Sequence, residues 1–157
     1  MTQTKVIGES VKQTNRTFVK SYVEDYAKAI TENYRRYHIN TLNGNLHGNY
    51  PEYAREQLDA IENGTANLMK FKVYTGKRYY KIVQQEFETW EKSKYYGQYR
   101  DSSVHCFVDK ETGDVYKPAS WSAPAKHIRF SFQNVDHLKF LLNPDNVGWA
   151  GGYLYIR

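Results

Sequence analysis

The sequence has a single cysteine, Cys106, among its 157 residues. One thiol cannot close an internal disulfide, and it also excludes a zinc finger built from several cysteines. Val104 and Val108 lie two residues to either side of it, as on one face of a strand. We therefore predict that Cys106 packs in the core and is not a reactive nucleophile.

Long apolar segments are also missing. No run of about 18 apolar residues is present, so the sequence offers no membrane-spanning helix. The beginning of the chain, MTQTKVIGES, lacks the charged and then apolar pattern of a signal segment. These two absences predict an intracellular protein that does not enter a membrane or, if the protein is viral, one made in the host cytoplasm.

Motifs for catalysis and for cofactors are few. The sequence has neither GxGxxG nor GxxxxGK, and no pair among its 5 histidines has the HExxH spacing. No cofactor is expected on these grounds. An enzyme stays open as a third hypothesis, because His105 and His127, each expected on the non-core side of a strand, could meet on one sheet face near Ser120 or Asp109.

Acidic residues cluster once in a way that suggests a metal site. The segment DKETGD contains the carboxylates of Asp109, Glu111 and Asp114. An EF-hand loop needs alternating oxygen donors, a central glycine and a terminal glutamate, and this segment lacks that layout. Its composition favours a tight turn between antiparallel strands, with Gly113 where a positive φ is needed.

The composition is that of a globular protein rich in tyrosine. Hydrophobic residues make up 40% and charged residues 25%, which is typical of one folded domain of this length. The 15 tyrosines suit half-buried positions, because each has an apolar ring and a polar tip. They are interpreted either as residues at the core boundary or as part of a stacking or docking surface.

The first half of the chain has helical periodicity. Large apolar side chains recur at steps of three and four over Thr17–Tyr37, and Pro51–Asn63 repeats the pattern before a terminating glycine. The asparagines and glycines of His38–Tyr50 predict a loop between these helices. Met1–Arg16 is polar and is interpreted as a flexible arm that precedes a single domain, residues 17–157.

From Asn67 onward the period changes to two, which predicts strands. Asn134 is expected to cap a short helix, Val135–Leu142. This order predicts an α+β fold in which the N-terminal helices pack on a mainly antiparallel β-sheet. The predicted strands are Asn67–Tyr74, Arg78–Gln84, Ser103–Val108, Val115–Lys117, His127–Phe132 and Tyr153–Arg157.

Two windows, Asn63–Gln85 and Val115–Val135, contain basic residues and no acidic ones, and the chain carries a net charge of +5. Cations that follow phosphates, together with rings that stack on bases, are how many proteins bind single-stranded nucleic acid. The alternative is that the cations only solvate the outer sheet face while tyrosines pack against their stems. The candidate contacts are Lys70, Lys72, Arg78, Tyr80, Lys81, Lys117, Trp121, Lys126, His127 and Arg129.

Three strings in the C-terminal half are distinctive: KRYYKIV (Lys77–Val83), SVHCFVDKETGDVYKPASWSAPAKHIRFSF (Ser103–Phe132) and GWAGGYLYIR (Gly148–Arg157). In these strings the sequence resembles a group of small bacteriophage proteins of unknown function. The resemblance implies a phage accessory protein that acts on nucleic acid, on host machinery or within the particle. It assigns no activity to any residue.

Two main hypotheses follow from the sequence. The first is a phage accessory protein that binds nucleic acid, with single strands favoured, and performs no catalysis. The second is a protein-interaction role, as a virion component or as an inhibitor of a host defence or transcription protein. The tyrosine content and the N-terminal arm favour the second, and the oligomeric state is not predicted.

Overall fold

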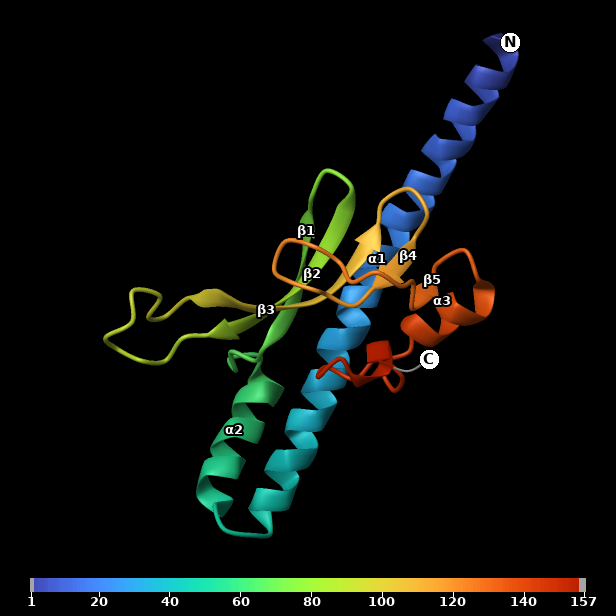
Figure 1. Ribbon diagram of the computed structural model, residues 1–157. Helices are drawn as coiled ribbons and strands as arrows, with labels where there is room; N and C mark the ends of the chain where they lie inside the picture. The colour runs from blue at the N-terminus through green and yellow to red at the C-terminus, as the bar shows by residue number, and fades with distance from the viewer. Residues whose placement is uncertain (1, 156–157) are drawn as a thin grey trace.

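The computed structural model describes the backbone of residues 2–155 and the side chains of residues 15–155. Two N-terminal helices precede a five-stranded sheet, and a short helix and a 3-10 turn follow it (Figure 1). The predicted α+β class is therefore confirmed. The elements are α1 (Thr2–Leu46), α2 (Pro51–Asn63), β1 (Lys70–Thr75), β2 (Tyr79–Phe87), β3 (Tyr99–Asp109), β4 (Asp114–Tyr116), β5 (Phe130–Ser131), α3 (Val135–Leu141) and η1 (Gly152–Tyr155).

The sheet is an antiparallel meander with the order β1-β2-β3-β4-β5. Each strand pairs with the next one along the chain, so every connection is a hairpin or a loop between neighbours. β2 and β3 form the longest pair, and their far ends project beyond the body of the molecule (Figure 1). The meander presents two faces, and α1 covers only one of them.

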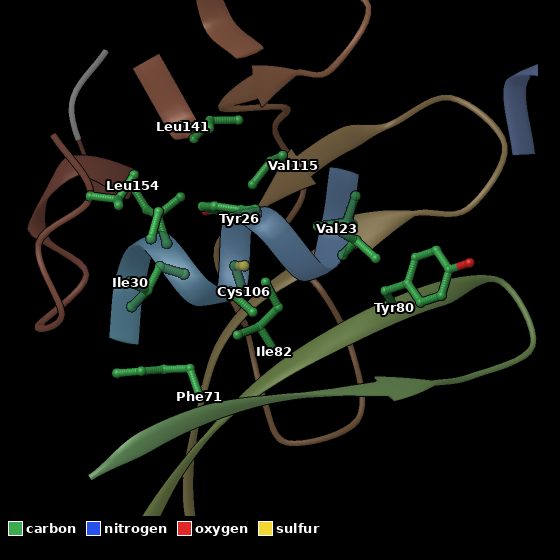
Figure 2. Packing of buried hydrophobic residues seen from close by; sticks show 14 of the residues in the cluster. Val23, Tyr26, Ile30, Phe71, Tyr80, Ile82, Cys106, Val115, Leu141 and Leu154 are labelled. Carbon is green, nitrogen blue, oxygen red and sulfur yellow. The ribbon is translucent and has the colours of Figure 1, made fainter. Parts of the chain in front are cut away.

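The core lies between α1 and this covered face. Val23, Tyr26 and Ile30 recur at three- and four-residue steps on α1, and all three are buried. They meet residues such as Ile82 and Cys106 from the strands (Figure 2). Full burial of one Val or Ile side chain contributes roughly 1.5–3 kcal/mol, so this apolar stripe fixes which face of the sheet turns inward.

Helix α1 is longer than the sequence pattern indicated. It includes the predicted helix Thr17–Tyr37 but continues to Leu46, so the expected loop from His38 was wrong over most of its length. Leu42 is fully buried there, and Ala54 of α2 is buried as well. Packing between these helices outweighs the weak helix propensity of Gly44, about 1 kcal/mol relative to Ala.

The expected N-terminal arm, Met1–Arg16, is also helical in backbone from Thr2 onward, and Met1 lies outside the described residues. The first turns of α1 extend past the sheet as a projection (Figure 1). Backbone helix thus runs without interruption across the expected boundary at Arg16.

Two predicted strands are much reduced. The segment His127–Phe132 pairs only at Phe130–Ser131, and Ile128, expected to point inward, is 54% exposed. The predicted terminal strand is instead the 3-10 turn η1, and its last two residues lie outside the described residues. Both segments pack on helices instead of adding a full strand. Phe130 stacks on Phe140 of α3, Phe132 contacts Tyr26 of α1, and Tyr153 is buried against Tyr26 as well.

Several predictions from local sequence patterns are confirmed. Helix α2 has the predicted bounds, and Gly64 terminates it with a φ of 76°. The Asn134 side chain accepts hydrogen bonds from the backbone amides of Asp136 and His137 and so caps α3. Gly113 closes the β3–β4 turn with a φ of 75°.

Gly113 offers a test of the fold with a matched control. A Cβ at this position would lie 2.7 Å from Phe132 Cβ, so Gly113→Ala combines a strained φ with a clash in the core. Gly64→Ala has the same strain but meets no atom within 4 Å. We expect urea unfolding to show a loss of about 1 kcal/mol for Gly64→Ala and about 3 kcal/mol or more for Gly113→Ala. Equal losses at the two positions would contradict the described packing of Phe132 on the turn.

Candidate nucleic-acid interface

The face of the sheet that points away from α1, here called the outer face, carries most of the first basic window. Lys70 and Lys72 of β1 are exposed, and Lys72 lies opposite Val83 in the register of β1 and β2. Tyr74 lies opposite Lys81, which in turn lies opposite Phe107. Directly opposed residues share a face, so these three side chains form one row across three strands.

The cations on this face lie over aromatic rings. Lys70 Nζ is 4.0 Å from the centre of the Tyr99 ring, and Lys72 Nζ is 5.0 Å from that of Tyr74. The Arg78 guanidinium lies 5.1 Å from the Tyr79 ring. Each such exposed contact is worth about 0.5–1 kcal/mol and holds a charge on the surface. Arg78 also forms an ion pair with Asp109, at 3.6 Å.

Trp121 is brought to the outer face by the loop after β4. Lys81 Nζ donates a hydrogen bond of 2.9 Å to the backbone oxygen of Trp121 and lies 4.6 Å from its ring. The loop is closed at its base, where the Ala125 amide donates to the Lys117 carbonyl at 2.8 Å. A rigid loop thus presents a ring that is 46% exposed beside a lysine.

A pocket of about 500 Å³ lies between this loop and the β1–β2 turn. Its aromatic lining consists of Tyr74, Tyr79, Phe107 and Trp121, and Lys77, Arg78 and Lys81 supply its positive charge. The single acidic residue in its lining is Asp101. Of these rings Trp121 is exposed, whereas Phe107 is buried. An exposed ring beside several cations can stack a planar group and bind a phosphate next to it.

Asp101 is held in a defined orientation at one side of the pocket. Its Oδ1 accepts hydrogen bonds from Gln85 Nε2 at 2.8 Å and from the Tyr74 hydroxyl at 2.9 Å. Burial and the hydrogen bond to Asp101 raise the pKa of Tyr74, so its hydroxyl remains a donor at neutral pH. The carboxylate is therefore positioned by two neighbours, of which Gln85 is buried.

The fold places the ten candidate contacts predicted from the sequence in different parts of the molecule. Arg78, Lys81 and Trp121 line the pocket, and Lys70 and Lys72 lie on the same outer face. Tyr80 is only 6% exposed and belongs to the core cluster, so its prediction as a stacking group was wrong. The alternation of β2 places Tyr79, not Tyr80, on the outer face with Lys81.

The cations of the second window do not line this pocket. Lys117 Nζ lies 4.3 Å from the Tyr155 ring, and Lys126 and His127 are exposed on the loop before β5. Arg129 is half-buried, and its Nε has no hydrogen-bond partner among the described residues. The two basic windows therefore contribute unequally, and only Trp121 and Ser122 of the second reach the pocket.

Sequence reasoning also missed several lining residues: Tyr74, Tyr79, Phe107, Lys77 and Asp101. A period of two places Tyr74 on the same face as Lys70 and Lys72, and the same count over β2 could have selected Tyr79 together with Lys81. No local signal indicated Asp101, because its position depends on the pairing of β3 with Gln85 on β2.

His105 does not lie on the outer face as predicted. A β-bulge makes Ile82 pair with Cys106 and Val83 with Val104, so His105 is the additional residue of β3. The bulge turns His105 toward the core, where it packs against Phe71 and shares a 2.8 Å hydrogen bond with the Tyr153 hydroxyl. The hypothesis that His105 meets His127 on one sheet face is therefore wrong, because His127 is exposed and His105 is buried.

A buried polar chain continues from His105. The hydroxyls of Tyr153 and Tyr26 are 2.6 Å apart, and they link the C-terminal turn η1 to α1. Burial raises the pKa of the neighbouring Cys106 thiol to about 12, so this cysteine stays protonated and unreactive. The prediction that Cys106 is a core residue is confirmed.

The carboxylates of the acidic turn are engaged by contacts within the protein, and Asp109 Oδ2 also pairs with Arg78 at 3.6 Å. Asp109 Oδ1 accepts hydrogen bonds from the amides of Glu111 and Thr112 at 2.8 and 3.0 Å. Asp114 accepts a hydrogen bond from the Thr112 hydroxyl at 2.9 Å. Within the part of the chain whose side chains are described, no group of three or more His, Cys, Asp or Glu side chains could hold a metal ion.

Fold and pocket together define a small α+β protein with one sheet face packed by a helix. The other face is cationic and aromatic and is partly covered by the loop that carries Trp121. The chain belongs to a family of unknown function, DUF7717, whose model matches residues 5–156. No curated protein and no solved structure matches the chain. None of the helices in the described residues is both long and apolar enough to cross a membrane.

The buried histidine makes stability depend on pH. Burial lowers the pKa of His105 to about 4, against 6.5 for the free side chain. The unfolded chain therefore binds a proton between these values that the folded chain does not, and stability falls as the pH drops from 6.5 to 4. We expect this residue to contribute a loss of about 3 kcal/mol over that range.

Urea titrations at several pH values measure this contribution. His105→Gln removes the titrating group, so its free energy of unfolding should fall less than that of the wild type between pH 6.5 and 4. Parallel pH curves for the two proteins would contradict a buried neutral histidine.

Proposed function

We propose that this protein binds single-stranded nucleic acid on the outer face of its sheet, without catalysis. The observation that carries the proposal is the pocket in which Trp121 lies beside Lys81, Lys77 and Arg78. A stacked base on the ring would place its phosphate among these cations. Lys70 and Lys72 extend the positive surface along β1, in the direction that a neighbouring nucleotide would follow.

The geometry favours a single strand over a duplex. Stacking on Trp121 requires a base whose face is free, and the bases of a duplex are stacked on one another. The resemblance of Lys77–Arg157 to phage proteins supports placing such a protein among phage accessory factors that act in the host cell.

Fluorescence anisotropy with a labelled single-stranded oligonucleotide tests the proposal. We expect a Kd of about 1–10 µM at low salt, and Trp121→Ala should weaken binding about tenfold, because one stacked base contributes roughly 1–3 kcal/mol. Trp90→Ala is the matched control, since Trp90 is 63% exposed but does not line the pocket. Equal affinity of the Trp121→Ala and Trp90→Ala variants would exclude stacking on Trp121, and no binding at low salt would refute the proposal.

The salt dependence of binding tests the role of the cations. The double variant Lys77→Gln/Arg78→Gln should reduce the slope of log K against log salt by about 1.4, since each contact to a single strand contributes about 0.7. The variant Lys92→Gln/Lys94→Gln removes the same charge from the β2–β3 loop and should leave the slope unchanged. A similar reduction in both variants would indicate a general effect of net charge and not a contact in the pocket.

A second candidate is binding to a host or virion protein through the projecting β2–β3 hairpin. Trp90, Tyr95 and Tyr96 are exposed on its loop, and exposed aromatic residues are enriched at protein interfaces. In this case, co-purification of a partner from infected cells should be lost in Trp90→Ala/Tyr96→Ala and retained in Trp121→Ala. The opposite pattern would remove the hairpin as the contact surface.

A further inference from the structure

Asp101 is an unexpected residue in a pocket that is otherwise cationic. Its carboxylate repels phosphate, so it weakens any binding that depends on the backbone alone. It nevertheless lines the pocket together with Lys81 and Trp121. A ligand with a hydrogen-bond donor would offset this repulsion by binding the carboxylate.

The hydrogen bonds around Asp101 leave one of its oxygens accessible. Oδ1 accepts from both Gln85 Nε2 and the Tyr74 hydroxyl, at 2.8 and 2.9 Å. Among the hydrogen bonds of the described residues, Oδ2 accepts only a share of the same Tyr74 hydroxyl, at 3.1 Å. A carboxylate oxygen accepts two hydrogen bonds, so Oδ2 retains capacity on a group whose orientation is already fixed.

We propose that Asp101 makes the pocket selective for nucleobases that carry an exocyclic amino group. The inference rests on the proposed function, and it adds the kind of base that the site accepts. A base stacked on Trp121 would direct an edge toward Asp101, and carboxylates in nucleic-acid interfaces accept hydrogen bonds from the N4 amino group of cytosine. The chemistry extends to other amino-bearing bases.

Uracil and thymine are disfavoured by the same geometry. Their C4 position bears a carbonyl oxygen, which would face the carboxylate with like partial charge. Their N3–H donor is flanked by two carbonyl oxygens, so a carboxylate that approaches this donor is repelled by both oxygens. Cytosine and uracil have nearly the same size and stacking area, and the comparison between them isolates Asp101.

Anisotropy titrations of labelled (dC)8 and (dU)8 at pH 7.5 test this inference. We expect the wild type to bind (dC)8 about tenfold more tightly than (dU)8. Asp101→Asn offers both a donor and an acceptor, so the ratio should fall close to one, mainly through tighter binding of (dU)8. Asp59→Asn on α2 removes the same charge far from the pocket and should keep the wild-type ratio.

The outcomes separate this inference from the function on which it rests. Tight but equal binding of both oligonucleotides by the wild type would overturn base selection and leave the nucleic-acid interface intact. A preference for (dC)8 that persists in Asp101→Asn would also overturn it, because a group other than Asp101 would then select the base. Failure of the wild type to bind either oligonucleotide would overturn both proposals.

Discussion

The packing of α1 against one face of the sheet is the constraint on which the rest of the structure depends. Val23, Tyr26 and Ile30 commit that face to the core, and the burial of each contributes more than any cation–aromatic contact on the surface. The strand alternation then leaves the opposite face to Lys70, Lys72, Tyr74 and Lys81. The chemistry of the outer face is in this sense a consequence of the core, because residues of β1 and β2 that point away from α1 contact β3 side chains such as Tyr99 and Asp101, the Trp121 loop, or solvent.

Local signals in the sequence predicted the elements whose stability is local. Helix α2, the cap of α3 and the glycine turn after β3 all depend on residues within a few positions of one another. The extension of α1 to Leu46 could not be predicted in this way, because the burial of Leu42 against α2 outweighs the glycines and asparagines nearby. The reduced strand at Phe130–Ser131 has the same origin, since the docking of segments distant in sequence decides how far the ladder extends.

Only part of the candidate site could be predicted from the sequence, for a related reason. The alternation of β1 and β2 places Lys70, Lys72 and Lys81 on one face. The same rule selects Tyr79 and not Tyr80, which was predicted as a contact. The bulge at His105 changes the side of the sheet to which a residue points, and nothing in VHCFV indicates where it falls. The hydrogen bond from Lys81 to the Trp121 carbonyl joins the two windows through residues 40 positions apart. It brings the Trp121 ring into the pocket, while the cations of the second window lie outside it.

The central claim is that a nucleic-acid strand binds at the Trp121 pocket, and the three tryptophans allow one direct measurement. Trp121 lines the pocket, Trp90 lies on the hairpin loop, and Trp149 packs against Tyr34 on α1. In a proton–nitrogen NMR spectrum, each indole N–H gives its own signal. Titration with a short single-stranded oligonucleotide should shift the Trp121 signal and leave those of Trp90 and Trp149 in place. An unmoved Trp121 signal, or a shift confined to Trp90 or Trp149, would contradict the account.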